Sequence, residues 1–148
     1  MADLVFKDDK YCFACGPDNS EGLKMKVTRL NGSARAEVVL RREHQGWKEM
    51  AHGGLVSTLL DEIMAHAVID RYPHAVTARL MVRYRRPVPL GETLLVEGCI
   101  SGQKKRIVIA EASVRLQETG QILATAESKF LKFKNTEPES ETGRADQA

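Results

Sequence analysis

The stretch HGGLVSTLLD, residues 52–61, is the clearest structural signal in the chain, because two glycines stand at the start of an apolar series. After Gly54, large apolar residues recur at three- and four-residue steps as far as Val68, which predicts an amphipathic helix of about four turns. The unpaired N–H groups at the start of this helix can polarise a carbonyl oxygen or hold an anion. Glycine also lets a ligand approach the main chain closely.

Asp61 is the unusual member of this helix, because it stands two turns inside the apolar series. On a helical wheel it shares its face with small residues, among them Ser57, which leave space above the carboxylate. A carboxylate in apolar surroundings costs several kcal/mol unless it is paired, hydrated or functional, so Asp61 marks a candidate site. The alternative is an ion pair with an arginine or hydration at the surface. We expect Glu62 to face solvent or a partner subunit, and His52 to cap the helix rather than transfer protons.

The chain of 148 residues has the size and composition of one globular domain, with 43% hydrophobic and 28% charged residues. We expect the domain over residues 1–134 and a disordered polar tail over 135–148, where large apolar side chains are almost absent. The formal charge of +2 is too small for a nucleic-acid footprint. The sequence contains neither a signal peptide nor a run that approaches the roughly 18 apolar residues of a membrane span, so we predict a cytoplasmic protein.

Three cysteines form an odd count, which argues against a disulfide framework and agrees with a reducing compartment. Cys12 and Cys15 make up a lone CxxC motif. A structural zinc site usually has a second pair of Cys or His ligands at matching spacing, and the sequence shows no such pair. We therefore expect neither a metal site nor a cofactor, and interpret residues 12–19 as a turn.

The rest of the chain carries strand patterns. Two strands are predicted at 23–30 and 34–41, joined by the turn Asn31-Gly32 into an antiparallel hairpin. After Pro73 has ended the helix, four more strands are predicted at 76–86, 93–103, 105–117 and 121–133. The economical architecture is an α+β fold in which an antiparallel sheet of five or six strands wraps around one long central helix.

The first strand after the helix alternates in a way that indicates one buried face. Leu80, Val82 and Tyr84 share the apolar side, whereas Thr77 and Arg79 are predicted on the other side. A sheet with one helix leaves its second face and its edges unprotected, which suggests a dimer or larger assembly.

The order of one hairpin, one helix and four strands, together with HGG and an aspartate nine residues after its histidine, resembles the hotdog-fold thioesterases. The similarity is greatest to the phenylacetate-pathway type of acyl-CoA thioesterase. It covers about residues 12–133 and includes CFACGPDNSEGL (12–23), HQGWKEMAHGGLVSTLLDE (44–62) and AVTARLMVRYRRPVPLGE (75–92). The resemblance implies an acyl-CoA substrate and a homodimer, or a homotetramer, whose active sites are shared between protomers.

The resemblance also implies roles for individual residues. Asp61 corresponds to the catalytic carboxylate, which acts as general base or as nucleophile. The N–H of Gly53 or Gly54 corresponds to the donor that binds the thioester oxygen, and His52 orients this turn or the substrate. Further candidates for contact with substrate or water are Gln45, Gly46, Trp47, Ser57, Thr77, Arg79 and Arg83.

One position departs from the pattern of some relatives, which carry an amide side chain six residues before the histidine of HGG. Here that position is Gly46, with Gln45 beside it. The predicted function is hydrolysis of an acyl thioester to a free acid and CoA. The alternative is a non-catalytic acyl-CoA binding or sensing protein, and a third possibility is a purely structural dimer module. Dehydration or hydration of acyl thioesters is disfavoured, because the sequence lacks the signatures of those enzymes.

Overall fold

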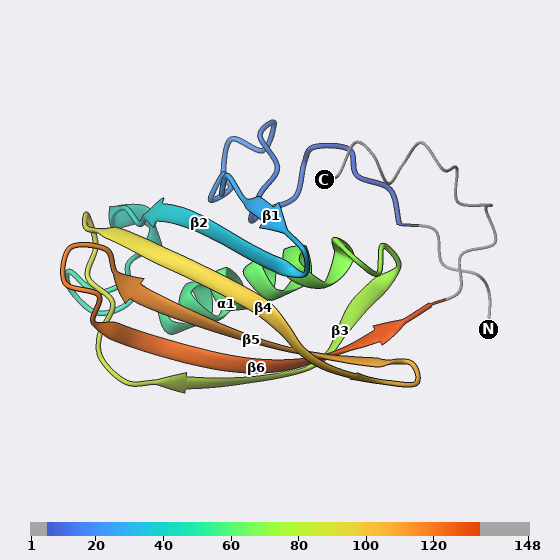
Figure 1. Ribbon diagram of the computed structural model, residues 1–148. Coiled ribbons are helices and arrows are strands. Elements are labelled where there is room, and N and C mark those ends of the chain that lie inside the picture. The colour runs from blue at the N-terminus through green and yellow to red at the C-terminus, as the bar shows by residue number, and fades with distance from the viewer. Residues whose placement is uncertain (1–5, 134–148) are drawn as a thin grey trace.

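The computed structural model describes residues 6–133, in which one sheet curls around helix α1 (Gly53–Ile69) (Figure 1). The predicted tail at 135–148 lies outside the described residues. The strands are β1 (Thr28–Leu30), β2 (Ser33–Val39), β3 (Ala75–Tyr84), β4 (Thr93–Lys104), β5 (Ile107–Leu116) and β6 (Ile122–Lys132), with the short helix η1 at Arg42–His44.

All strand pairs are antiparallel, and the order across the sheet is β1-β2-β4-β5-β6-β3. The predicted α+β hotdog architecture is therefore confirmed, with six strands. The order leaves β1 and β3 at the two edges. Because β3 is ten residues long and pairs only with β6, it exposes a full row of unpaired backbone groups.

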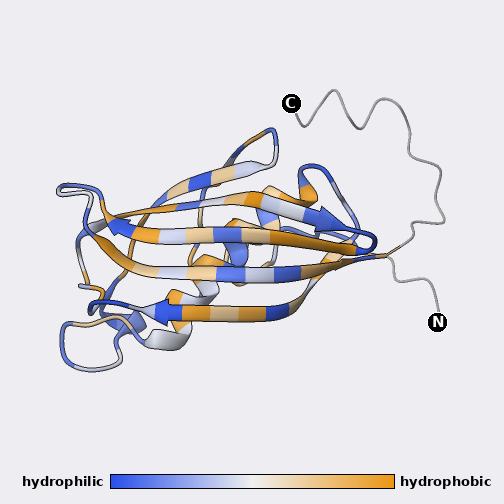
Figure 2. Ribbon diagram, turned by 60° about the horizontal axis from the view of Figure 1, so that its bottom comes forward, coloured by the Kyte–Doolittle hydropathy of each residue, from blue (hydrophilic) through white to orange (hydrophobic). Residues whose placement is uncertain are grey.

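The core lies between α1 and the concave face of the sheet. The predicted apolar periodicity of the helix is confirmed, since its buried side chains are Val56, Leu59, Leu60, Ile63, Met64, Ala67 and Val68. Hydrophobic and hydrophilic residues alternate along the strands, as Figure 2 shows. Among residues 6–133, no helix combines the length and the apolar character that a membrane span requires.

The first strand is shorter than predicted. Asn31 and Gly32 have the positive φ angles of 47° and 78° that the predicted hairpin turn requires. Before this hairpin, however, Lys24 has a φ of 50°, which interrupts an extended strand. The N–H groups of Leu23 and Met25 bond to carbonyl groups of residues 13 and 14 instead of to β2. Residues 23–27 therefore fix the N-terminal segment and do not belong to the sheet.

The predicted orientation of Thr77 is wrong, because strand β3 contains a bulge at this position. The register shifts between Thr77 and Arg79, so strict alternation fails at this point. Thr77 is paired with Phe130, which is buried at 1% exposure. Since directly paired residues share one face of a sheet, Thr77 points toward the helix and not to the outer face with Arg79.

Candidate active site

The N-terminus of α1 presents one free backbone donor. The His52 ring accepts the N–H of Gly54 through Nδ1 at 2.9 Å, which confirms that His52 caps the helix. The N–H of Gly53 makes no hydrogen bond within residues 6–133. Because it lies at the positive end of the helix dipole and is exposed, it is the donor available to a ligand oxygen.

Tyr84 fixes this end of the helix, although it was not among the predicted site residues. Its hydroxyl donates to the carbonyl oxygen of Gly53 at 2.8 Å and also contacts the hydroxyl of Ser57. Tyr84 shares the inward face of β3 with Leu80 and Val82, so the alternation of this strand carried the signal. The contact ties the last residue of β3 to the glycine turn.

Asp61 is half-buried and lies next to strand β3. The Thr77 hydroxyl donates to its Oδ1 at 2.7 Å. Burial raises the pKa of Asp61 above its usual value, and the negative charge of Glu62 adds to this, while the hydrogen bond from Thr77 acts in the opposite direction. Asp61 forms no ion pair with the residues that the structure describes, so the salt-bridge alternative is wrong for this part of the chain.

Gly53 and Asp61 do not converge within one protomer. Eight residues separate them along one helix, which corresponds to about 12 Å at a rise of 1.5 Å per residue. A single carbonyl group cannot contact both groups over this distance, because reacting atoms must approach to about 3 Å. The two predicted halves of the site are thus both present in the chain but are held apart.

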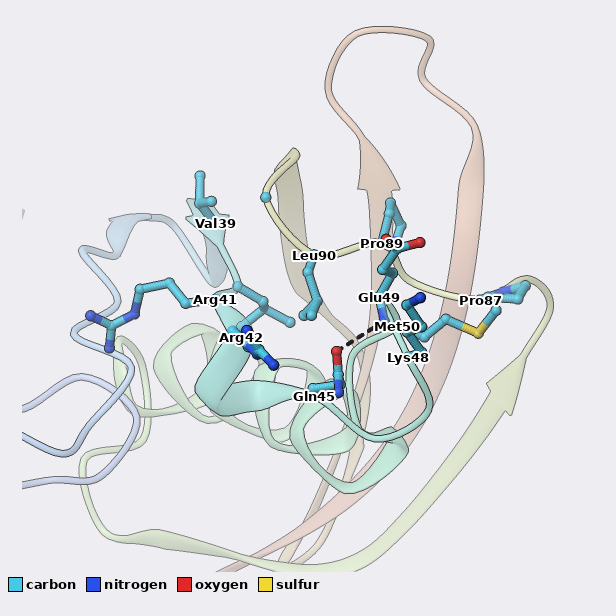
Figure 3. A pocket seen from close by; sticks show the side chains of 12 residues that line it. Val39, Arg41, Arg42, Gln45, Lys48, Glu49, Met50, Pro87, Pro89 and Leu90 are labelled. Carbon is cyan, nitrogen blue, oxygen red and sulfur yellow. Dashed lines mark hydrogen bonds between the residues drawn. The ribbon is translucent and has the colours of Figure 1, made fainter.

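Two cavities lie beside the helix N-terminus. The larger, of about 980 Å³, is lined by residues 39–42, 45, 48–50, 87 and 89–91, and Gln45, Lys48 and Leu90 are among the side chains drawn in Figure 3. The Oε1 atom of Gln45 accepts the N–H of Glu49 at 3.0 Å, so this amide braces the loop. A smaller cavity of about 290 Å³ reaches Gly53 and Tyr84. Asp61 lines neither cavity.

The positively charged side chains at the larger cavity differ in orientation. Arg41, Arg42 and Lys48 all belong to its lining, but in Figure 3 the guanidinium group of Arg41 points away from the other two, and its Nε lies 3.7 Å from a carboxylate oxygen of Glu43. These cations were not predicted as site residues, because nothing in their spacing shows that the loop before HGG folds over a cavity.

The other predicted contact residues are spread over the surface. Trp47 is 84% exposed and lines neither cavity. A Cβ atom at Gly46 would lie 3.0 Å from the Cα of His52, so the loop packs closely against the start of the helix. Arg79 and Arg83 are exposed on β3.

A sheet wrapped around one helix, with a glycine turn and a carboxylate on that helix, defines the hotdog class of proteins. A family model described as the thioesterase superfamily matches residues 49–123, just over half of the chain. The chain therefore belongs to the thioesterase superfamily.

Individual relatives agree with this assignment. Human acyl-coenzyme A thioesterase 13 is 26% identical over 111 residues, which cover 72% of this chain and 79% of that protein. The crystal structure of RHA08564, a thioesterase superfamily protein, matches with a TM-score of 0.78 and 29% identity over 83% of this chain. The match spans only 61% of the RHA08564 chain.

Two further solved structures show the same fold at lower identity. The PaaI protein from the phenylacetic acid degradation operon of Escherichia coli has a TM-score of 0.71 and 20% identity, over 77% of this chain and 83% of that one. The smu.793 protein of Streptococcus mutans, solved bound to acetyl CoA, has a TM-score of 0.70 and 22% identity, over 77% and 91%.

Proposed function

We propose that the chain is an acyl-CoA thioesterase that acts as a two-fold dimer, with Gly53 and the partner subunit's Asp61 on either side of each bound thioester. The observation that carries this proposal is the spacing of the two groups. Ser57 stands midway between Gly53 and Asp61 along the helix. A two-fold axis near Ser57, relating antiparallel helices, brings Gly53 next to Asp61 of the partner subunit.

The surface around Asp61 suits such a dimer. The face of α1 that carries Asp61 also carries Gly54, Ser57, Thr58 and Ala65, whose small side chains allow another helix to approach closely. The open edge of β3 lies nearby and would gain ten residues of pairing from a second copy. The same contact would enclose the space between Gly53 and the partner's Asp61, and a homotetramer would arise if two dimers associate.

The residues present support hydrolysis in the following way. The thioester oxygen accepts the N–H of Gly53, which stabilises the negative charge that develops there. If Asp61 acts as a base, it removes a proton from water, and the oxygen of that water bonds to the carbonyl carbon. The carbon–sulfur bond then breaks, and the proton passes from Asp61 to the leaving thiolate. Acting as nucleophile, the carboxylate instead expels the thiolate and forms an anhydride, which water then hydrolyses to the free acid.

The CoA moiety needs cations for its phosphates, and two sets of residues could supply them. Arg42 and Lys48 line the 980 Å³ cavity, which shares Pro87 with the smaller cavity that reaches Gly53. Arg79 and Arg83 on β3 are the set that the sequence favoured. We place the phosphates at Arg42 and Lys48. Known relatives of the same fold include one solved with acetyl CoA, which favours this ligand class.

A cytoplasmic location is part of this proposal. Cys12, Cys15 and Cys99 are all free thiols, as suits a reducing compartment.

Release of free thiol from a panel of short, medium and aromatic acyl-CoAs tests the proposed reaction. We expect many turnovers per protomer on the best substrate, together with an increase of the unfolding temperature by a non-hydrolysable analogue. The binding or sensing alternative is motivated by Gly46, which replaces an amide. It predicts the same thermal stabilisation by intact acyl-CoA with no turnover at all, and that result would overturn the enzymatic proposal.

Thr77→Val is expected to reduce kcat by about 10- to 100-fold, because the hydrogen bond that holds the Asp61 carboxylate contributes about 1.5–3 kcal/mol. Thr77→Ser keeps the hydroxyl and is expected to retain most of the activity. Steady-state kinetics of both variants on the best acyl-CoA provide the measurement. Full activity of the valine variant, which has nearly the shape of threonine, would show that the Thr77 hydroxyl does not support Asp61.

A further inference from the structure

The CxxC motif meets the central helix in a cluster that the proposed thioesterase site does not use. The Sγ atoms of Cys12 and Cys15 and a carboxylate oxygen of Glu62 all lie within 4.8 Å of one another. The Sγ of Cys12 is 3.8 Å from Oε1 of Glu62. Our expectation that Glu62 faces solvent is therefore wrong, since its side chain is only 18% exposed and packs against its own N-terminal segment.

From this cluster we infer a zinc site in which Cys12, Cys15 and Glu62 are three of the ligands and water is the fourth. In tetrahedral zinc sites, the bond lengths of about 2.3 Å to sulfur and about 2.1 Å to oxygen place ligand atoms about 3.6–3.8 Å apart. The separation of Cys12 and Glu62 already has this value. Two sulfur ligands select zinc over magnesium or calcium, which prefer oxygen.

The ligands are held in place without a metal. The N–H of Gly16 donates to the carbonyl oxygen of Cys12 at 2.8 Å, and this turn is so tight that a Cβ at Gly16 would lie 2.3 Å from the Cys12 nitrogen. Between the two cysteines, the carbonyl groups of Phe13 and Ala14 accept the N–H groups of Leu23 and Met25. The turn therefore directs both thiols toward α1 before any ion binds.

The carboxylate is oriented by residues next to the cluster. His66, one turn after Glu62 on α1, has Nε2 at 3.1 Å from Glu62 Oε1, while its Nδ1 accepts the Nε–H of Arg29 at 2.9 Å. The ring proton is thus on Nε2 and is donated to Glu62, an arrangement that commonly supports metal-bound groups. This site could not be recognised from the sequence, because the ligand that completes the CxxC motif is a distant carboxylate on α1 and not a second pair of Cys or His residues.

The cluster can also balance the charge of a divalent cation, because it holds one carboxylate and two free thiols. Zinc would replace the two thiol protons, which are released to solvent as two thiolate bonds form. The bound ion would fasten residues 12–15 to α1 beside Asp61.

Cobalt(II) and zinc added to the reduced, metal-free full-length protein test this inference. We expect cobalt to give the thiolate-to-metal charge-transfer absorption of a site with two sulfur ligands, and one equivalent of zinc to abolish it. Zinc is also expected to raise the unfolding temperature. Absence of this absorption in the reduced parent protein would overturn the inference without any variant.

Variants identify the ligands. Cys12→Ser and Cys15→Ser are expected to lose the absorption, and Glu62→Gln to weaken zinc binding by about tenfold or more. Cys99→Ser, which removes the free thiol on β4, is the matched control and should bind as the parent does. Retention of the absorption in the Cys12 and Cys15 variants, or its loss in the Cys99 variant, would contradict the assignment. Asp61→Asn should bind metal normally, so the metal site and the thioesterase site can fail independently.

Discussion

Asp61→Asn is expected to reduce kcat for the best acyl-CoA by about 10² to 10⁴-fold, the usual contribution of a general base. The amide keeps the size of the side chain and still accepts the hydrogen bond from Thr77, but it has no basic oxygen and is a poor nucleophile. Because burial raises the pKa of the native carboxylate, its charge is costly in this position. The neutral variant should therefore unfold at no lower temperature than the parent.

Asp70→Asn, the next residue after the same helix, is the matched control. Asp70 accepts the N–H of Gly32 through Oδ2 at 3.1 Å, and asparagine retains an oxygen for this bond. The substitution removes the same charge without touching the proposed site, so kcat should change little. If the Asp61 variant hydrolysed acyl-CoA as fast as this control, the role of Asp61 would be refuted.

Gly53→Pro is expected to reduce kcat by about 10² to 10³-fold, because it removes the N–H that we propose as the donor to the thioester oxygen. The substitution suits the backbone unusually well. Gly53 is the first residue of α1, where proline is favoured, and the preceding His52 has φ −62° and ψ 132°, the extended conformation that proline requires before it. A Cβ atom there would lie 3.7 Å from the Tyr84 ring, an ordinary contact.

Gly53→Ala distinguishes the effect of losing the N–H donor from the effect of adding side-chain atoms. Alanine introduces a Cβ atom at the same place but retains the N–H, so this variant should keep much more activity than the proline variant. Circular dichroism and thermal unfolding would check that both variants keep the helix. Equal activity of the alanine and proline variants would show that the Gly53 N–H does not bind the oxygen.

The fold was predictable from the sequence because its signals are local. The apolar steps of α1 and the Asn31-Gly32 turn are set by neighbouring residues, and the structure confirms both. The shortened β1 and the orientation of Thr77 were not predictable in this way. Each depends on a single backbone irregularity, the positive φ at Lys24 and the bulge in β3, that the identity of the residue does not reveal.

For the candidate site, too, local features were predictable from the sequence and long-range contacts were not. His52 was predicted as a cap from its position alone, and the structure confirms it. Tyr84, Arg42 and the contact between Glu62 and Cys12 depend on residues that are far apart in the sequence and meet only after the chain has folded. The separation of Gly53 from Asp61 could be calculated from the helical rise, and it is the reason why we propose a site shared between two protomers.

Complementation between two inactive variants tests the shared site most directly. When Asp61→Asn and Gly53→Pro chains are co-expressed, each mixed dimer contains one site with an intact Gly53 facing the partner subunit's intact Asp61, and one site that lacks both. Random assembly then predicts about a quarter of the parental activity, since half of the dimers are mixed and half of their sites are intact. If the mixed dimers, once purified with two different tags, were as inactive as either variant alone, the two groups would not act across the dimer.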